Sequence, residues 1–170
     1  MKKVFMALVA MFALSTVAEA QITVGLASYD GKYFTCQYPD DFEADDDPII
    51  ASMFEAVKDD QHKMQISIND VTKSAQEFKE WVDYQKAIYS TSEYWKADAP
   101  VCKGQTMTMR RVLIKNEDPD AENVKMVAYD FAAVSPKSKK LFTGEIHFPL
   151  SEESTYKPLI DRIVASLKEK

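Results

Sequence analysis

The feature that most constrains the fold is a change of hydrophobic period near residue 74. From His62 to Asn69 apolar and polar residues alternate, which predicts a strand with one buried face. From Ser74 the stretch "SAQEFKEWVDYQKAIYS" places apolar residues three and four positions apart, which predicts a helix over 75–90. Ser74 and Glu77 have the spacing of a capping box at its start. The sequence therefore predicts a domain that mixes strands and helices.

Three strand-like runs follow the predicted helix, and short polar turns separate them. The runs cover 101–115, 124–135 and 141–148, and the turns are "NEDPDAEN" and "SPKSKK". Sequential strands joined by short turns predict an antiparallel meander. Nearer the N-terminus, Lys32–Tyr38 is predicted as a strand that ends at Pro39. The run 49–57 fits either a short strand or a helical turn.

A second amphipathic helix is predicted near the C-terminus. Its apolar stripe consists of Tyr156, Leu159, Ile160, Ile163, Val164 and Leu167. Pro158 falls inside this stripe, so we expect it in the first helical turn, where a missing N–H costs nothing.

Residues 1–20 have the three-part pattern of a secretory signal peptide. A basic start precedes an apolar run, and Ala18-Glu19-Ala20 has the small-x-small pattern of a cleavage site before Gln21. The competing interpretation, a membrane anchor, is disfavoured because the apolar run is shorter than the roughly 20 residues that span a bilayer. We therefore expect an exported protein, periplasmic or secreted. Residues 21–170 would form a single α+β domain with no membrane span after cleavage.

The charge balance argues against two classes of partner. The whole chain has a formal net charge of −6, and loss of the leader would remove Lys2, Lys3 and Glu19. Nucleic acids and anionic membranes both favour a basic face, which an acidic chain does not supply. No nucleic-acid partner is expected.

The chain has two cysteines, Cys36 and Cys102. An even number of cysteines in an exported protein predicts a disulfide bond between them. The alternatives are two buried thiols or one catalytic thiol. A C-x-x-C motif is absent from the sequence, so a thioredoxin-type redox role has no support.

Six acidic residues lie between Asp40 and Asp47. Carboxylate oxygens are the ligands that Ca²⁺ prefers, so this stretch offers a weak candidate calcium site. The candidate ligands are Asp41, Glu43, Asp45 and Asp47. The spacing does not fit an EF-hand, because neither possible register has the required glycine and glutamate. A solvated loop that protects a strand end from pairing is the favoured interpretation.

Motifs for catalysis are absent from the sequence. It contains no P-loop, no G-x-G-x-x-G and no G-x-S-x-G. His62 and His147 each fall in a predicted strand, where a surface or edge-strand histidine is favoured over a zinc ligand. A hydrolase with a carboxylate pair stays open as an alternative, since such a pair is defined in space rather than by sequence spacing. Apart from the weak Ca²⁺ candidate, no cofactor is expected.

Aromatic residues gather around the end of the first helix. Trp81 and Tyr89 belong to its apolar stripe and are expected to be buried. Tyr84 lies off the stripe, and Tyr94 and Trp95 fall in the connection after the helix. Exposed aromatics in loops commonly take part in recognition, so these three residues form the candidate partner surface.

The order of predicted elements resembles the PsbP-like superfamily. The stretches that carry the resemblance are "YFTCQYP", "MQISIND" followed by "SAQEFKEWVDYQ", and "LIDRIVASLK". The superfamily includes the photosystem extrinsic protein, the Ran-binding Mog family and a set of exported bacterial proteins. The resemblance implies an α+β fold, an antiparallel sheet with helices packed on its faces in an α/β/α sandwich. It also implies a binding or assembly role rather than catalysis, and it transfers no functional residue.

The expected function is therefore an exported, non-enzymatic binding or assembly module of the cell envelope, with an unknown envelope protein as its partner. One alternative is a calcium-binding envelope protein that uses the loop 40–47. The other is a small hydrolase with a carboxylate pair.

Overall fold

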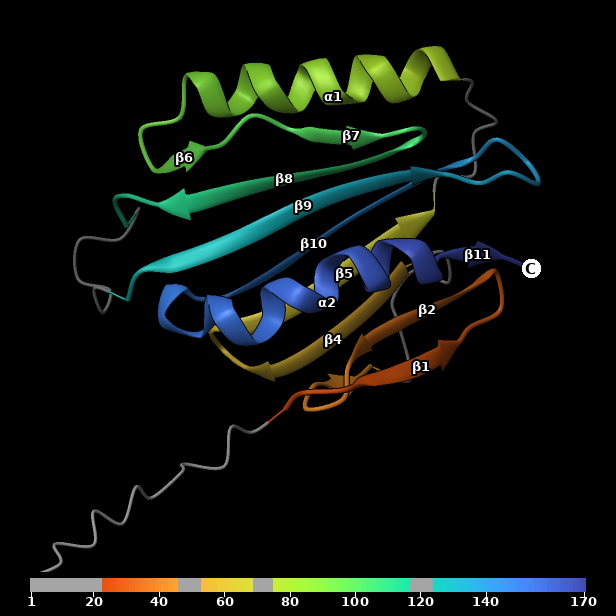
Figure 1. Cartoon of the computed structure of the whole chain (residues 1–170), viewed down its shortest axis with the longest axis horizontal. Helices are drawn as coiled ribbons and strands as arrows, with labels where there is room; N and C mark the ends of the chain where they lie inside the picture. Colours follow the sequence, from red (N-terminus) through yellow and green to blue (C-terminus); the bar gives the residue numbers. More distant parts are fainter. Residues whose placement is uncertain (1–22, 46–52, 69–74, 117–123) are drawn as a thin grey trace, which may run out of the picture.

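The computed structural model describes residues 23–45, 53–68, 75–116 and 124–170, with side chains described from residue 78 onward in the first helix. Within these residues the chain forms an eight-stranded antiparallel sheet, a three-stranded antiparallel sheet and two α-helices (Figure 1). None of the described helices is long and apolar enough to cross a membrane.

The large sheet has the order β3-β4-β5-β10-β9-β8-β6, and β7 pairs with the end of β8. Its strands are β3 (Glu43–Ala44), β4 (Met53–Asp59), β5 (His62–Ile68), β6 (Trp95–Ala97), β7 (Val101–Lys103), β8 (Thr106–Leu113), β9 (Met126–Val134) and β10 (Leu141–Pro149). The small sheet has the order β1-β2-β11, with β1 (Leu26–Asp30), β2 (Phe34–Pro39) and β11 (Lys168–Glu169). The helices are α1 (Ala75–Ser90) and α2 (Glu153–Ser166), and a 3-10 helix, η1 (Leu150–Glu152), leads into α2.

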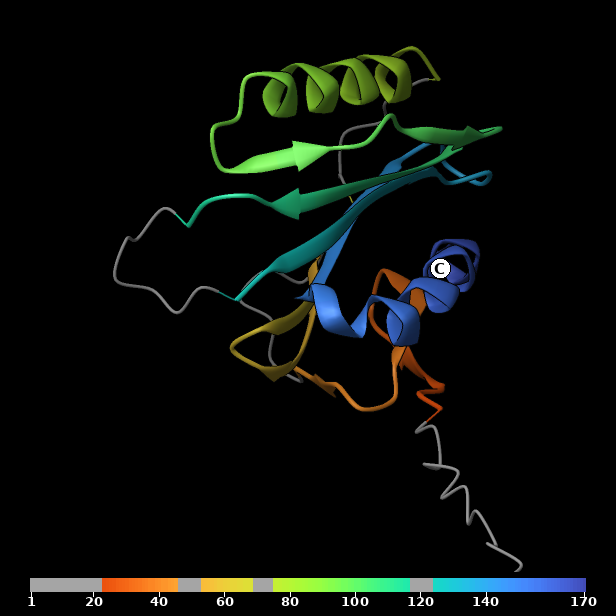
Figure 2. The same ribbon diagram turned by 60° about the vertical axis from the view of Figure 1, so that its left-hand side comes forward.

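Strand β9 shows how the layers are arranged, because it is buried on both faces. Its residues Val127, Tyr129 and Phe131 belong to the main core, together with the apolar stripe of α2. The alternate residues Ala132 and Val134 pack instead against apolar side chains of α1. Since neighbouring residues of a strand point to opposite faces, the two helices cover opposite faces of the sheet, as Figures 1 and 2 show. The predicted α/β/α arrangement is confirmed.

The main core lies between the large sheet and the layer formed by α2 and the small sheet. Fully buried aromatic side chains from five elements meet there, and they are Phe34, Phe54, Phe131, Phe142, Phe148 and Tyr156. Gly144, in the middle of β10, makes room for one of them. A Cβ atom at this position would lie 2.6 Å from the ring of Phe131 and 2.5 Å from the backbone oxygen of Gln65. The absence of a side chain therefore lets the Phe131 ring pack over the strand.

Several element predictions are confirmed, and one is wrong. The helix over 75–90 and the antiparallel meander are present, although the first run of the meander divides into β7 and β8 around Gly104, which has φ 61°. The ambiguous run 49–57 contributes to strand β4. Pro158 does not lie in the first turn of its helix, because η1 leads directly into α2 and the helix already begins at Glu153. Ser74 lies outside the described residues.

The predicted disulfide bond between Cys36 and Cys102 is wrong for this structure, in which both cysteines are free thiols. Cys36 lies in β2 with only 2% of its surface exposed, among the residues of the main core. Cys102 lies in β7, on the large sheet, and is exposed. Their number indicated a bond, but the fold places them on different sheets, one facing the core and the other facing solvent.

Thiol labelling should therefore distinguish the two cysteines. Burial raises the pKa of the Cys36 thiol to about 12, which disfavours the reactive thiolate. We expect one equivalent of iodoacetamide to react at Cys102 in the native protein at pH 8, and a second at Cys36 only after unfolding. Mass spectrometry of the labelled peptides measures this. An oxidised Cys36–Cys102 peptide pair, or native labelling at both residues, would contradict the structure.

Helix α2 is joined to the sheet by a polar cluster at its first turn. Arg110 on β8 contacts both carboxylate oxygens of Glu153, at 2.6 and 2.8 Å. The hydroxyl of Tyr129 on β9 donates a third hydrogen bond to the same carboxylate. The hydrogen bonds from Arg110, with that from Tyr129, lower the pKa of Glu153 to about 2. This cluster fixes where α2 begins on the sheet.

The cluster predicts a specific acid sensitivity. The ordinary pKa of Glu153 is 4.5 and its folded value is lower, so its contribution to stability is present above pH 4.5 and is lost as pH falls from 4.5 towards 2. We expect Glu153→Gln to cost on the order of 2 kcal/mol at pH 7, allowing for partial solvent screening, with the difference from wild type shrinking across that window. Urea denaturation at several pH values measures this. The exposed Glu93→Gln is the control, and a pH-independent cost at Glu153 would contradict the assignment.

Candidate functional site

Helix α1 covers only part of its face of the sheet. Its apolar side chains, among them Phe78, Trp81 and Val82, pack on β8, β9 and the start of β10. Farther along the same face, β10, β5 and β4 present polar side chains that are half-buried. These side chains are Thr143, Glu145 and His147 of β10, Lys63, Gln65 and Ser67 of β5, and Glu55 of β4. A polar strip therefore lies beside the helix rather than beneath it.

Strand register aligns four of these groups in one row. Asp130 pairs with Glu145, Glu145 pairs with Gln65, and Gln65 pairs with Glu55. Directly paired residues point to the same face, so the four side chains run across four neighbouring strands. The side-chain amide of Gln65 donates to Glu55, and the ammonium group of Lys63 lies 2.8 Å from the same carboxylate. The row thus carries three carboxylates and one amide.

Arg111 on β8 is the buried counterion of this row. Its Nε donates to Asp130 at 2.9 Å and its Nη2 donates to Glu145 at 2.5 Å. The side chains of Arg111 and Asp130 are each only 8% exposed. The guanidinium group also lies between two aromatic rings, 5.1 Å from the centre of Tyr89 and 4.2 Å from that of Trp95. Arg111 is therefore fixed by charge and by stacking together.

The two carboxylates bound to Arg111 have pKa values shifted in opposite directions. Burial raises the pKa of Asp130 to about 6, although Arg111 partly offsets the effect. The pKa of Glu145 is lowered, chiefly by the hydrogen bond with His147 and also by Arg111. His147 Nδ1 lies 3.5 Å from Glu145 Oε1. Glu145 is therefore the more strongly ionised member of the pair.

A hollow of about 270 Å³ lies between α1 and this row, and we call it the α1 groove. The wall from α1 consists of Trp81, Gln85 and Tyr89, and the floor and far side consist of Met53, Gln65, Ser67, Asp130, Thr143, Gly144 and Glu145. A second hollow of about 300 Å³ is lined in part by Trp95 and His147, the neighbours of Arg111 and Glu145. Arg111, Asp130 and Glu145 form what we call the ionic cluster, and two surface hollows border it.

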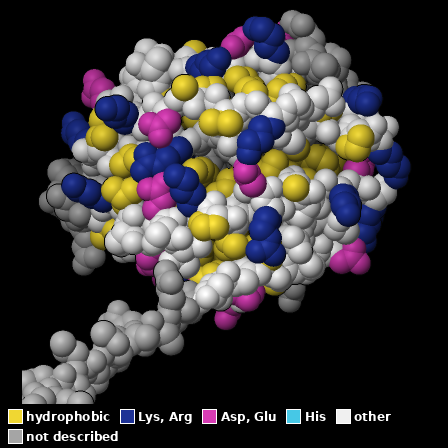
Figure 3. Space-filling model, viewed as in Figure 1, with side chains coloured by type: hydrophobic (Ala, Val, Ile, Leu, Met, Phe, Trp, Pro, Cys, Tyr) yellow, Lys and Arg dark blue, Asp and Glu magenta, His cyan; other side chains and the backbone are white. Residues whose placement is uncertain are grey.

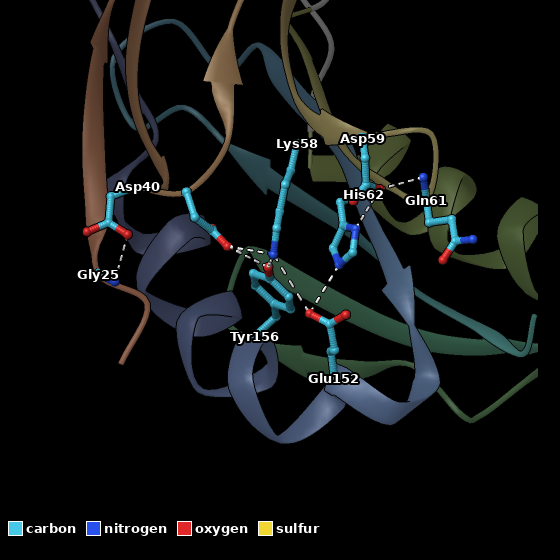
Figure 4. A network of polar contacts seen from close by, with 9 residues as sticks. Gly25, Asp40, Lys58, Asp59, Gln61, His62, Glu152 and Tyr156 are labelled. Atoms are coloured by element: carbon cyan, nitrogen blue, oxygen red, sulfur yellow. Dashed lines mark hydrogen bonds and ion pairs between the residues drawn. The ribbon is translucent and has the colours of Figure 1, made fainter. Parts of the chain in front are cut away.

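A separate polar network lies at the α2 side of the molecule (Figure 4). His62 is buried, with carboxylate oxygens at both ring nitrogens: Asp59 at 2.7 Å and Glu152 at 3.2 Å. The hydroxyl of Tyr156 donates to Asp41 at 2.7 Å and accepts from Lys58 at 3.0 Å. These contacts join the turn between β4 and β5 to the beginning of α2. The expectation of a surface or edge-strand role is wrong for His62, because β5 directs this side chain towards the core.

The described candidate calcium ligands each have their own place in the fold. The carboxylate of Asp41 contacts Lys58, at 3.1 Å, as well as Tyr156. Glu43 begins β3, and the backbone N–H of Asp45 donates to the oxygen of Glu55. Asp47 lies outside the described residues. In the described ranges no group of three or more His, Cys, Asp or Glu side chains could hold a metal ion.

The three aromatics of the candidate partner surface lie in different settings. Tyr84 is 62% exposed on the outer side of α1, where Ile88 is also exposed. Tyr94 is half-buried with the ammonium group of Lys115 over its ring. Trp95 was expected in a loop, but it begins β6 and its ring stacks on Arg111. Of the three, Trp95 is the one that touches the ionic cluster.

Sequence reasoning missed Arg111, Asp130 and Glu145. A signal was available for Asp130, because it is the one charged residue of an otherwise largely apolar strand run. A charge on a strand that is buried on both faces requires a partner, and the nearest partners lie on neighbouring strands. The predicted meander already makes these three strands neighbours, but the register that brings the charges together was not evident from the sequence.

The architecture, an antiparallel sheet with one helix on each face, places the chain in the fold class of Mog1. The Saccharomyces cerevisiae Ran-binding protein Mog1p is similar with a TM-score of 0.54 and 13% identity, over 85% of this chain and 95% of Mog1p. A point mutant of Mog1 gives 0.53 and 14% over the same shares. Cyanobacterial PsbP from Synechocystis gives 0.46 and 12%, over 92% of this chain and 99% of that protein.

No protein-family model matches the sequence, and no curated protein matches it. The similarity to Mog1p confirms the predicted resemblance for the fold. At 13% identity it carries no residue of a binding site from Mog1p to this chain.

Proposed function

We propose that this chain is an exported, non-enzymatic binding module of the cell envelope that recognises a partner protein through the α1 groove and its rim. One observation carries the proposal. Among the described residues, part of one sheet face is left uncovered beside α1, and it forms a hollow with an aromatic wall and a charged floor. Concave sites with apolar walls and a few convergent polar groups are the usual form of binding sites.

The rim supplies groups suited to a protein partner. Trp95 lies against Arg111 of the ionic cluster, Tyr94 precedes it in the chain, and Tyr84 is exposed on the outer side of α1. Aromatic side chains and arginine dominate the energy of protein interfaces, which supports these residues as contact points. The fold adds support, because Mog1p is described by its ability to bind another protein, Ran. Only the general role of protein binding is carried over.

Two further features support parts of the proposal. On the face seen in Figure 3, acidic and basic side chains are interspersed rather than gathered by sign, unlike the basic face that nucleic acids favour. The leader pattern of residues 1–20, which lie outside the described residues, supports export to the periplasm or beyond.

Site-specific photo-crosslinking tests the proposed surface. A benzophenone amino acid at Gln85, in the groove wall, should capture a discrete partner from envelope extract. The same group at Lys157, exposed on α2, is the matched control and should capture nothing at that mass. Capture at Gln85 should fall at least tenfold in a Tyr94→Ala/Trp95→Ala background. Equal capture from both positions, or full capture in the double variant, would show that the surface is wrong.

A small hydrolase is the second candidate, because Asp130 and Glu145 line the same hollow. Their pKa values are shifted apart, the pattern found in pairs that serve as acid and base. Against this, both carboxylates are bound to Arg111, and buried ion pairs perturb pKa values without any catalysis. A glycoside and ester screen decides between the two: turnover that Asp130→Asn abolishes would favour the enzyme.

A further inference from the structure

We infer that the α1 groove receives a cationic side chain, a lysine or an arginine, from a segment of the partner protein. This inference rests on the proposed function and specifies the chemistry of the partner. Three properties of the groove support a cationic ligand. They are the charge of its lining, the hydrogen-bond acceptors on its floor, and the shape and size of the hollow.

The charge of the lining has one sign. Among the residues that the structure describes, Asp130 and Glu145 are the charged residues that line the groove, and none of the lining residues is basic. Arg111 lies behind them and bonds to both, so the three groups together carry a net negative charge whenever both acids are ionised. The next acid in the row, Glu55, is neutralised by Lys63. His147, 3.5 Å from Glu145, does not line the groove, so a cation that enters meets two carboxylates that share one guanidinium, and an anion meets repulsion.

The polar lining is rich in hydrogen-bond acceptors. The side-chain amide nitrogen of Gln65 donates to Glu55, so its carbonyl oxygen is the acceptor that this side chain offers to a ligand. The hydroxyl groups of Ser67 and Thr143 lie on the same floor. Lysine and arginine side chains are donors only, so an acceptor-rich floor matches them.

The wall of the groove suits the rest of such a side chain. Trp81 and Tyr89 provide aromatic surface for an aliphatic stem or a guanidinium face. The chain itself already uses this chemistry, since Arg111 stacks between Tyr89 and Trp95 at the edge of the hollow. The volume of about 270 Å³ is smaller than that of most drug-sized ligand sites, which favours one inserted side chain.

The inference is tested by adding two short capped peptides to the folded protein and following its amide chemical shifts by NMR. One is Gly-Arg-Gly, and the other replaces arginine with citrulline, which has the same shape without the charge. We expect the arginine peptide to shift the amide signals of Gln65, Thr143 and Gly144 saturably. The citrulline peptide should bind at least tenfold more weakly, which corresponds to about 1.4 kcal/mol.

Three variants locate the effect. Glu145→Gln removes one of the two carboxylates that bind Arg111, and it should weaken binding of the arginine peptide at least tenfold. Gln85→Lys places a positive charge on the helical wall, away from the buried pair, and should weaken binding similarly even if Glu145→Gln unfolds. Asp161→Asn, on exposed α2 surface, changes net charge by the same amount as Glu145→Gln and should leave binding unchanged.

Equal binding of both peptides, shifts spread over the whole surface, or an equal effect of Asp161→Asn would overturn the inference. If the arginine peptide does not bind while Gln85 still crosslinks a partner, the binding module stands and the cationic side chain is wrong. If neither occurs, the proposed function falls with it.

Discussion

Replacing Arg111 with methionine is expected to lower the free energy of unfolding by about 3–5 kcal/mol at pH 7. Methionine keeps an unbranched apolar stem but leaves the buried carboxylate of Asp130 without its counterion. The stacking on Tyr89 and Trp95 is lost at the same time. Guanidinium denaturation measures the loss, and Arg162→Met, at an exposed position of α2, should stay within about 0.5 kcal/mol of wild type.

The Arg111 variant should also depend on pH in a defined direction. The pKa of Asp130 is already raised to about 6 by burial, and it rises further once Arg111 is absent. Protonation then removes the unpaired charge, so the deficit relative to wild type should shrink as pH falls from 7 to 5. The double variant Arg111→Met/Asp130→Asn should recover most of the loss at pH 7. A deficit that is independent of pH and of Asp130 would show that packing, not charge, explains it.

Tyr156 is the second position where a large effect is expected. Its side chain is fully buried, with its ring centre 4.8 Å from that of Phe148 and its hydroxyl between Lys58 and Asp41. Tyr156→Ala should cost about 3–5 kcal/mol through the cavity it leaves. Tyr156→Phe keeps the ring and should cost about 1–2 kcal/mol, because only the hydroxyl contacts are lost.

Chemical denaturation of both Tyr156 variants, beside Tyr84→Ala, separates packing from hydrogen bonding. Tyr84 is exposed and its truncation should change stability by less than about 0.5 kcal/mol. Equal losses for Tyr156→Phe and Tyr156→Ala would mean that the hydroxyl network, rather than the ring, dominates.

Local periodicity predicted most of the elements of this fold. The apolar spacing after Ser74 predicted α1, and the alternation in β5 predicted a half-buried strand whose core face includes Met64 and Ile66. These predictions succeed because 3.6-residue and two-residue periods are properties of adjacent residues. The start of α2 was misplaced because η1 extends the helical segment before Pro158.

The site could not be predicted in the same way, because it depends on register between distant strands. Asp130, Glu145, Gln65 and Glu55 form a row only through three specific strand pairings, and a slip of one residue would move a whole strand's side chains to the other face. Trp95 was assigned to a loop because three residues of strand are too few to produce a period. Cys36 and Cys102 were paired by their number, whereas their positions on two sheets decided the outcome.

The two faces of the large sheet hold cores of very different size, so the two helices should detach from the sheet at different free energies. Among the described residues, the α2 side has one extended cluster, whereas α1 packs on two clusters of three buried residues each. Elements with few buried contacts open at lower free energy than the rest of a domain. In native-state hydrogen exchange, amides of α1 should therefore exchange through sub-global detachment, while those of β9 wait for global unfolding. Helix α1 forms one wall of the groove, so the helix that would contact a partner can also detach without loss of the fold. A bound partner should therefore slow amide exchange in α1 before it slows exchange elsewhere.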